Sequence, residues 1–251
     1  MEEKILEECA LYFRKDKAYT CMFAELKKKY IKYGRLSGKI FLANLSEAEC
    51  VALGKVFGRS LLPGDFVFSV SELQVALNET RFCGVEMEAL VERYFEEKLV
   101  SNSRRREEKK ACNNRFWEAV LDEVGSRFGE DAGGTQWLKG VREQRKYGYH
   151  LIIREREKSS DSIKEMLMEV CGALAYLSRE DRNGAGFVRL AVLGAEVTKN
   201  PHCFDRQNAP GRLLISALSY IYREEEPTAQ EDILALYYKA GIAPDDISSY
   251  T

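Results

Sequence analysis

The sequence has few of the residues and patterns that usually mark a chemical site. It contains only two histidines, His150 and His202, far apart in the chain, which argues against a histidine-based metal centre. Its seven cysteines are an odd number, widely spread and without a C-x-x-C pair, so neither a disulfide framework nor a zinc knuckle is indicated. With 5 prolines and 18 glycines in 251 residues, the chain is neither collagen-like nor a low-complexity linker. We therefore expect a folded core with reduced cysteines, no metal and no cofactor.

Long apolar runs and a dominant charge are also missing. No segment approaches the roughly 18 apolar residues of a membrane-spanning helix, and the N-terminus carries acids where a secretory signal would carry Lys or Arg. Lys and Arg number 38 against 40 Asp and Glu, a net charge of −2. A nucleic-acid partner would therefore have to meet a local basic patch. We expect a soluble, cytoplasmic protein without a membrane partner.

Apolar residues recur every three or four positions through most of the chain, which predicts helices. Two short segments, 38–43 and 66–68, instead predict strands, and each precedes a serine–glutamate pair with the spacing of a capping box. The first pair is Ser46 with Glu49. The order of helices and strands permits a winged-helix-like module, although other small α+β folds share this order.

The polar run Ser101–Arg106 is the best candidate for a domain boundary. Beyond it, amphipathic stripes predict further helices, one of them capped by Ser162. The predicted fold class is mainly α (α+β), with a winged-helix-like lobe over residues 1–100 and a helical bundle over residues 101–251.

Catalytic motifs are scarce, because the chain has no P-loop, no G-x-S-x-G elbow and no H-E-x-x-H helix. His202, Cys203 and Asp205 are the one local cluster that resembles a nucleophile set. Adjacent side chains diverge, so this cluster makes a poor catalytic dyad. A structural role in the loop before the next helix is the favoured interpretation, and we assign no catalytic residue.

Two basic runs are the strongest candidates for a binding site. The first holds a set of cations on a predicted helix and the strand after it: Lys27, Lys28, Lys29, Lys32, Arg35 and Lys39. The second is Arg104, Arg105 and Arg106, followed by two glutamates. Phosphates bind such surfaces through counterion release, independently of base sequence. An ordinary solvated helix side is the alternative for both runs, and the sequence leaves it open.

Three stretches resemble a known family in their order and spacing. The first, from Gly38 to Glu49, reads "G-x-I-x-L-x-N-L-S-x-x-E" and includes Asn44 and Ser46. The second reads "P-H-x-x-D … G-R-L", and its motif residues are His202, Asp205, Gly211 and Arg212. The third covers residues 240–248. Together they resemble the JetD-like subunit of Wadjet plasmid-defence systems, bacterial condensin-like assemblies that cleave invading circular DNA.

The resemblance implies a function for the family rather than a reaction for this chain. In that family the N-terminal half precedes a Toprim-type nuclease domain, related to the topoisomerase VI A subunit, which binds a divalent metal such as Mg. That domain would follow Thr251, where this chain stops. The implied partners are double-stranded DNA and SMC/condensin-like subunits, and homodimerisation is left open. The motif residues of this chain are then expected to be structural.

Three hypotheses for the function remain open. In the first, the chain is the DNA-engaging, non-catalytic region of a JetD-like nuclease subunit. In the second, it is a protein–protein adaptor that docks onto SMC-like partners without touching DNA. The third, a small-molecule enzyme, would require a deep pocket with converging ionisable groups.

Overall fold

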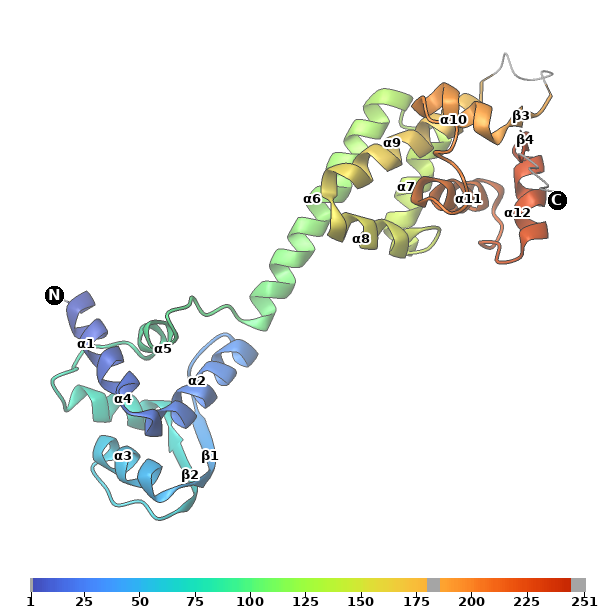
Figure 1. Ribbon diagram of the computed structural model, residues 1–251. Coiled ribbons are helices and arrows are strands. Elements are labelled where there is room, and N and C mark those ends of the chain that lie inside the picture. Colours follow the sequence, from blue (N-terminus) through green and yellow to red (C-terminus); the bar gives the residue numbers. More distant parts are fainter. Residues whose placement is uncertain (1, 180–185, 245–251) are drawn as a thin grey trace. The chain divides into compact units, whose positions relative to one another are not determined.

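The computed structural model describes residues 2–179 and 186–244 (Figure 1). Within these residues the chain is mainly helical, with twelve α-helices and two two-stranded sheets, which confirms the predicted fold class. It divides into two compact units, residues 1–112 and 113–251, and each is described by itself. Of the third motif stretch, residues 245–248 lie outside the described residues. None of the described helices is long and apolar enough to cross a membrane.

Unit 1 holds helices packed on one small sheet. Its elements are α1 (Glu2–Arg14), a 3-10 turn (Lys17–Tyr19), α2 (Thr20–Tyr33), β1 (Lys39–Leu45), α3 (Glu47–Phe57), β2 (Gly64–Ser69), α4 (Val70–Asn78) and α5 (Met87–Phe95). The strands β1 and β2 are antiparallel and are joined through α3. Helix α1 packs against α5, and α2 packs against both α5 and β1.

The first sheet has the alternation of a half-buried strand. Ile40, Leu42 and Leu45 of β1 point into the core, whereas Phe41 on the opposite face is exposed and pairs with Val67 across the strands. The strands predicted at 38–43 and 66–68 are therefore confirmed.

Local capping signals delimit the helices of unit 1. Ser46 and Glu49 form a complete capping box at the start of α3, and Ser69 and Glu72 form another at α4. Gly34 ends α2 in the left-handed conformation, with φ +72°, which glycine adopts without steric cost.

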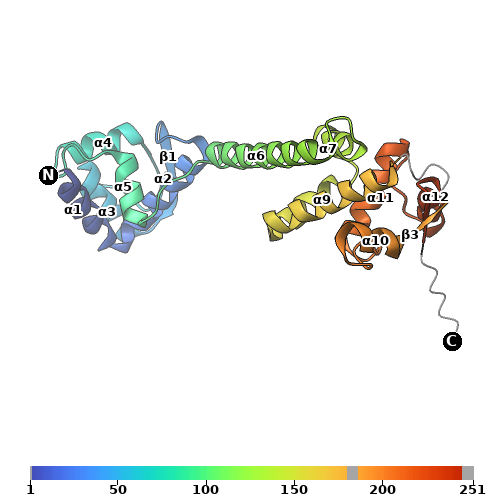
Figure 2. The same cartoon turned by 90° about the horizontal axis from the view of Figure 1, so that it is seen from above.

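Helix α6 (Asn102–Phe128) begins in unit 1 and continues without interruption into unit 2 (Figure 2). Its first eleven residues, 102–112, are all exposed, whereas Trp117, Val120 and Val124 in its second half are buried. Ser101 supports the start of the helix, because its Oγ accepts a hydrogen bond from the Arg104 backbone N–H at 3.2 Å. The polar run Ser101–Arg106 is thus the cap and first turns of a long helix.

Unit 2 is a helical bundle around α9. Besides the second half of α6 it contains α7 (Gly133–Gln144), α8 (Tyr149–Lys158), α9 (Ser160–Leu177), β3 (Val188–Arg189), α10 (Leu190–Thr198), α11 (Ala209–Tyr222), α12 (Gln230–Lys239) and β4 (Ile242–Ala243). Helix α9 packs against α7, α8, α10 and α11, and its buried stripe includes Leu167, Val170 and Leu174. The strands β3 and β4 form a short parallel pair.

One predicted cap in unit 2 is wrong by three residues. Ser159, not Ser162, caps α9, and its side chain accepts a hydrogen bond from the Ser162 backbone N–H at 3.2 Å. Both serines precede the same apolar stripe, so the sequence alone did not separate the cap from the third residue of the helix.

Candidate nucleic-acid interface

The cations predicted on α2 divide into those already bound within unit 1 and those left exposed. Lys27 is bound: its Nζ lies 2.5 Å from Glu97 and 4.3 Å from the centre of the Phe95 ring. Lys28 pairs with Glu25 at 2.5 Å, although 71% of its side chain is exposed. These two cations are engaged with neighbours of their own unit.

Lys29 is also used internally, because its ammonium donates a hydrogen bond to the Lys39 backbone oxygen at 2.5 Å. This bond ties the end of α2 to the start of β1. Lys32, Arg35 and the side chain of Lys39 are exposed and have no ion pair among the described residues. Lys32 lies over the ring of its neighbour Tyr33, with 5.0 Å from the Nζ to the ring centre.

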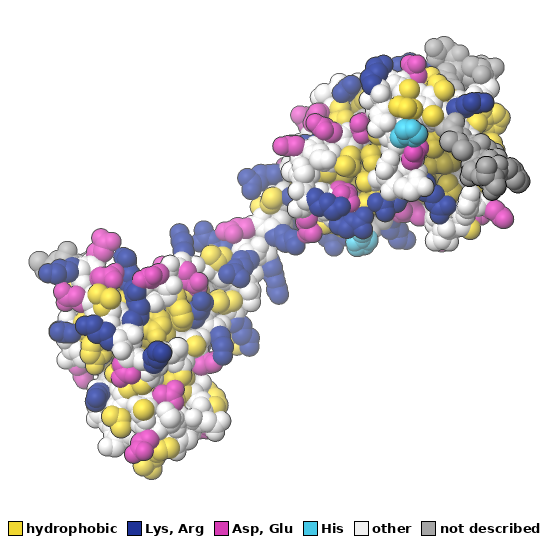
Figure 3. Space-filling view, viewed as in Figure 1, with side chains coloured by type: hydrophobic (Ala, Val, Ile, Leu, Met, Phe, Trp, Pro, Cys, Tyr) yellow, Lys and Arg dark blue, Asp and Glu magenta, His cyan; other side chains and the backbone are white. Residues whose placement is uncertain are grey.

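The second basic run lies on the exposed first turns of α6. Arg104 pairs with Glu108 at 3.1 Å, in the i, i+4 geometry that supports isolated helices. Arg105 and Arg106 are exposed and have no ion pair in the described part of the chain. Figure 3 shows Lys and Arg side chains gathered around the first turns of α6.

Unit 1 brings the two basic runs together. A Cβ built on Gly34, at the end of α2, would lie 3.4 Å from the Cβ of Ser101, which precedes α6. The end of α2 and the start of α6, about seventy residues apart in the sequence, thus lie side by side in unit 1. The exposed cations of the two runs that have no ion pair among the described residues are Lys32, Arg35, Lys39, Arg105 and Arg106, and we refer to them as the basic cluster.

The first family motif has structural explanations. Asn44 adopts a left-handed backbone with φ +51° at an irregularity between Leu42 and Leu45, and its N–H donates to Asp65 Oδ1 at 3.0 Å. Asparagine tolerates this conformation better than most residues. Ser46 and Glu49 form the α3 capping box, in which the hydrogen bonds from Ser46 lower the pKa of the Glu49 carboxyl.

The second motif builds the loop before α11. His202 Nδ1 lies 3.0 Å from Asp205 Oδ2, and the Asn208 side chain donates to the His202 backbone oxygen at 2.7 Å. Gly211 is required by close approach, since a Cβ there would lie 2.2 Å from the Asp205 backbone oxygen. These contacts close the loop onto the helix.

Cys203 does not face His202 as a nucleophile would. Its Sγ lies 3.4 Å from Glu169 Oε2 on α9, and the residue is 7% exposed. Burial, with the neighbouring Glu169 charge, raises the pKa of the Cys203 thiol to about 11, so the thiol is protonated at neutral pH. The geometry favours the structural interpretation of this cluster.

In the described residues, no three His, Cys, Asp or Glu side chains form a group suited to a metal ion.

Arg212 differs from the other residues of the second motif in the contacts of its side chain. It lies on α11, is exposed, and has no side-chain hydrogen bond or ion pair in the described residues. It lines a cavity of about 560 Å³ together with Arg154 and Arg206. From its motif, Arg212 is expected to be structural, and no signal in the sequence points to Arg154 or Arg206, because these arginines come from separate segments and share no local pattern.

Residues 36–251 match a family model described as "Protein of unknown function N-terminus (DUF3323)". The chain belongs to this family. No curated protein and no solved structure matches it. The DUF3323 region includes most of the basic cluster, the capping boxes and all of unit 2.

Proposed function

We propose that this chain is the DNA-engaging, non-catalytic region of a JetD-like subunit of a bacterial anti-plasmid defence system. The observation that carries the proposal is the basic cluster of unit 1, where five exposed cations without an ion pair among the described residues come from α2, the loop after it, β1 and α6. The ordered motifs from Gly38 to Arg212 support the family part of the proposal.

The cluster is suited to the phosphate backbone rather than to base edges. Its cations are exposed on α2, on the loop after it, on β1 and on α6, and exposed Lys and Arg side chains reach phosphates without a fixed register. Tyr33, 59% exposed beside Lys32, adds an aromatic surface next to the charges. We therefore expect affinity for duplex DNA that depends strongly on salt and little on sequence.

The test is a charge reversal at the end of α2 (the α2 variant), Lys32→Glu with Arg35→Glu in the loop after it, followed by fluorescence anisotropy on a labelled duplex. The matched control is Lys15→Glu with Lys17→Glu, which changes the same charge in unit 1 on exposed residues near the start of α2. At 1.5 Å per helical residue, the control lies about 20 Å along α2 from the cluster. We expect the α2 variant to lose most of its DNA affinity and the control to keep it.

Equal affinities and equal salt slopes for the wild type and the α2 variant would contradict the DNA contact. The adaptor role would then account for the chain, and a pull-down with the SMC/condensin-like subunits would be the next measurement. If both variants lost affinity equally, net charge rather than the basic cluster would govern binding.

A further inference from the structure

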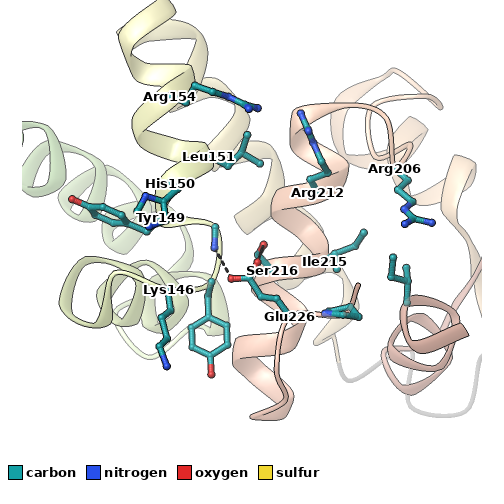
Figure 4. Close-up of a pocket in the computed structure, with 14 residues that line it drawn as sticks. Lys146, Tyr149, His150, Leu151, Arg154, Arg206, Arg212, Ile215, Ser216 and Glu226 are labelled. Atoms are coloured by element: carbon teal, nitrogen blue, oxygen red, sulfur yellow. Dashed lines mark hydrogen bonds between the residues drawn. The ribbon is translucent and has the colours of Figure 1, made fainter. Parts of the chain in front are cut away.

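Unit 2 contains a cavity of about 560 Å³ whose rim is basic (Figure 4). Arg154 comes from α8, Arg206 from the loop before α11, and Arg212 from α11 itself. Lys146 and His150 also line it. The volume is within the range of small-molecule sites and much larger than a single phosphate group requires.

Among the described residues, Glu226 is the only acidic side chain that lines the cavity, and both of its carboxylate oxygens already accept hydrogen bonds within the protein. Its Oε1 accepts a hydrogen bond from the Gly148 N–H at 3.0 Å, and its Oε2 accepts one from Ser216 Oγ at 2.8 Å. The glutamate therefore holds the start of α8 against α11 and does not pair with the arginines. Both donors are neutral, so the carboxylate keeps its charge, but the lining also holds four cations, Lys146, Arg154, Arg206 and Arg212.

Most N–H donors of the three arginines make no hydrogen bond within the described residues. Arg206 and Arg212 have no side-chain hydrogen bond or ion pair in the described residues, and Arg154 uses one nitrogen to contact Glu155 at 3.3 Å. A guanidinium presents five N–H donors in a planar fork that matches carboxylate and phosphate oxygens. Three such groups around one opening favour a ligand with several anionic oxygens, which a phosphate monoester has.

The wall behind the rim is largely apolar. Ile215, 7% exposed, lies on α11, and Ile233, 5% exposed, lies on α12. Leu151, Tyr147 and Pro227 are further apolar or aromatic residues of the lining. A ligand that filled the cavity would therefore place its anionic end at the arginines and a flat or apolar body against this wall.

We infer that the cavity of unit 2 binds a nucleoside phosphate, with the phosphate at Arg206 and Arg212 and the nucleoside against Ile215 and Ile233. The inference goes beyond the proposed function and does not rest on it, because the basic cluster belongs to unit 1. A free nucleotide and the phosphorylated 5′ end of a DNA strand share this chemistry.

The experiment is isothermal titration of the full chain with AMP, inorganic phosphate and adenosine. We expect AMP to bind more tightly than phosphate, and adenosine not to bind. Arg206→Gln with Arg212→Gln should weaken AMP at least about tenfold, because each charge-assisted hydrogen bond contributes on the order of one decade in affinity. The control, Arg127→Gln with Lys164→Gln, removes the same charge elsewhere in unit 2 and should change nothing.

Absence of AMP binding, an equal affinity for adenosine or for phosphate, or an unchanged affinity in the arginine variant would each overturn the inference. A 5′-phosphorylated trinucleotide identifies the source: tighter binding than AMP assigns the cavity to a strand end, and equal or weaker binding assigns it to a free nucleotide. Duplex DNA with 5′-hydroxyl ends should bind the Arg206/Arg212 variant as tightly as the wild type. The test of the cavity can therefore fail without contradicting DNA binding by the basic cluster, and the reverse also holds.

Discussion

Removing two cations of the basic cluster on α6 should change the salt dependence of DNA binding by a calculable amount. The variant is Arg105→Gln with Arg106→Gln. Both side chains are exposed and neither has an ion pair in the described residues, so their loss leaves no acid unpaired. The fold of unit 1 should therefore be unchanged, and the effect should appear in DNA binding alone.

The structure sets the size of the expected change. Of the nine cations in the two basic runs, Lys27, Lys28, Lys29 and Arg104 are engaged within unit 1, which leaves the five of the basic cluster. Each neutralised phosphate contributes about 0.9 to the slope of log affinity against log salt, so five contacts predict a slope of about −4.5. The double variant should have a slope of about −2.7 and bind about 60-fold more weakly at 0.1 M salt.

The assay is fluorescence anisotropy with a labelled duplex of mixed sequence, over a salt series from about 50 to 200 mM. Lys27→Gln is an informative second variant, because Lys27 is held by Glu97 and Phe95 and should leave the slope almost unchanged. A wild-type slope near −8 would show that the four engaged cations, Arg104 included, also contact phosphates. An Arg105/Arg106 variant with the wild-type slope would refute the assignment of α6 to the DNA surface.

Three further predictions concern stability, each measured by urea unfolding. Gly211→Ala should destabilise the protein by about 1–3 kcal/mol, because its Cβ would lie 2.2 Å from the Asp205 backbone oxygen, whereas a helix-interior Gly→Ala change without such a contact stabilises. Ser46→Ala should cost about 1 kcal/mol through loss of the α3 cap, and a cost near zero would contradict the capping box. Burial raises the pKa of the Glu169 carboxyl in the folded protein, so ionisation of this group opposes folding. The free energy of unfolding therefore falls as the pH rises from the pKa of Glu169 in the unfolded chain to its higher pKa in the folded protein. Glu169→Gln should accordingly be more stable than the wild type at pH 7 but not near pH 4, and equal differences at both pH values would refute the burial argument.

The local elements of this protein could be predicted from its sequence because their causes are local. Ser46 and Glu49 are three residues apart and form the capping box wherever the segment is placed. The helical stripe before Gly34 and the alternation around Ile40 likewise depend on neighbours a few positions away. The cap of α9 was misplaced because Ser159 and Ser162 satisfy the same local rule.

Which charged side chains are available to a ligand was decided only by tertiary structure. Lys27 and Lys32 look alike in sequence, yet Glu97, seventy residues away, occupies the first and leaves the second exposed. Likewise, Arg212 has its role at a cavity only because the chain returns to bring Arg154 and Arg206 beside it. Pairing and burial depend on distances in space between residues far apart in the chain, and a sequence pattern carries no measure of those distances.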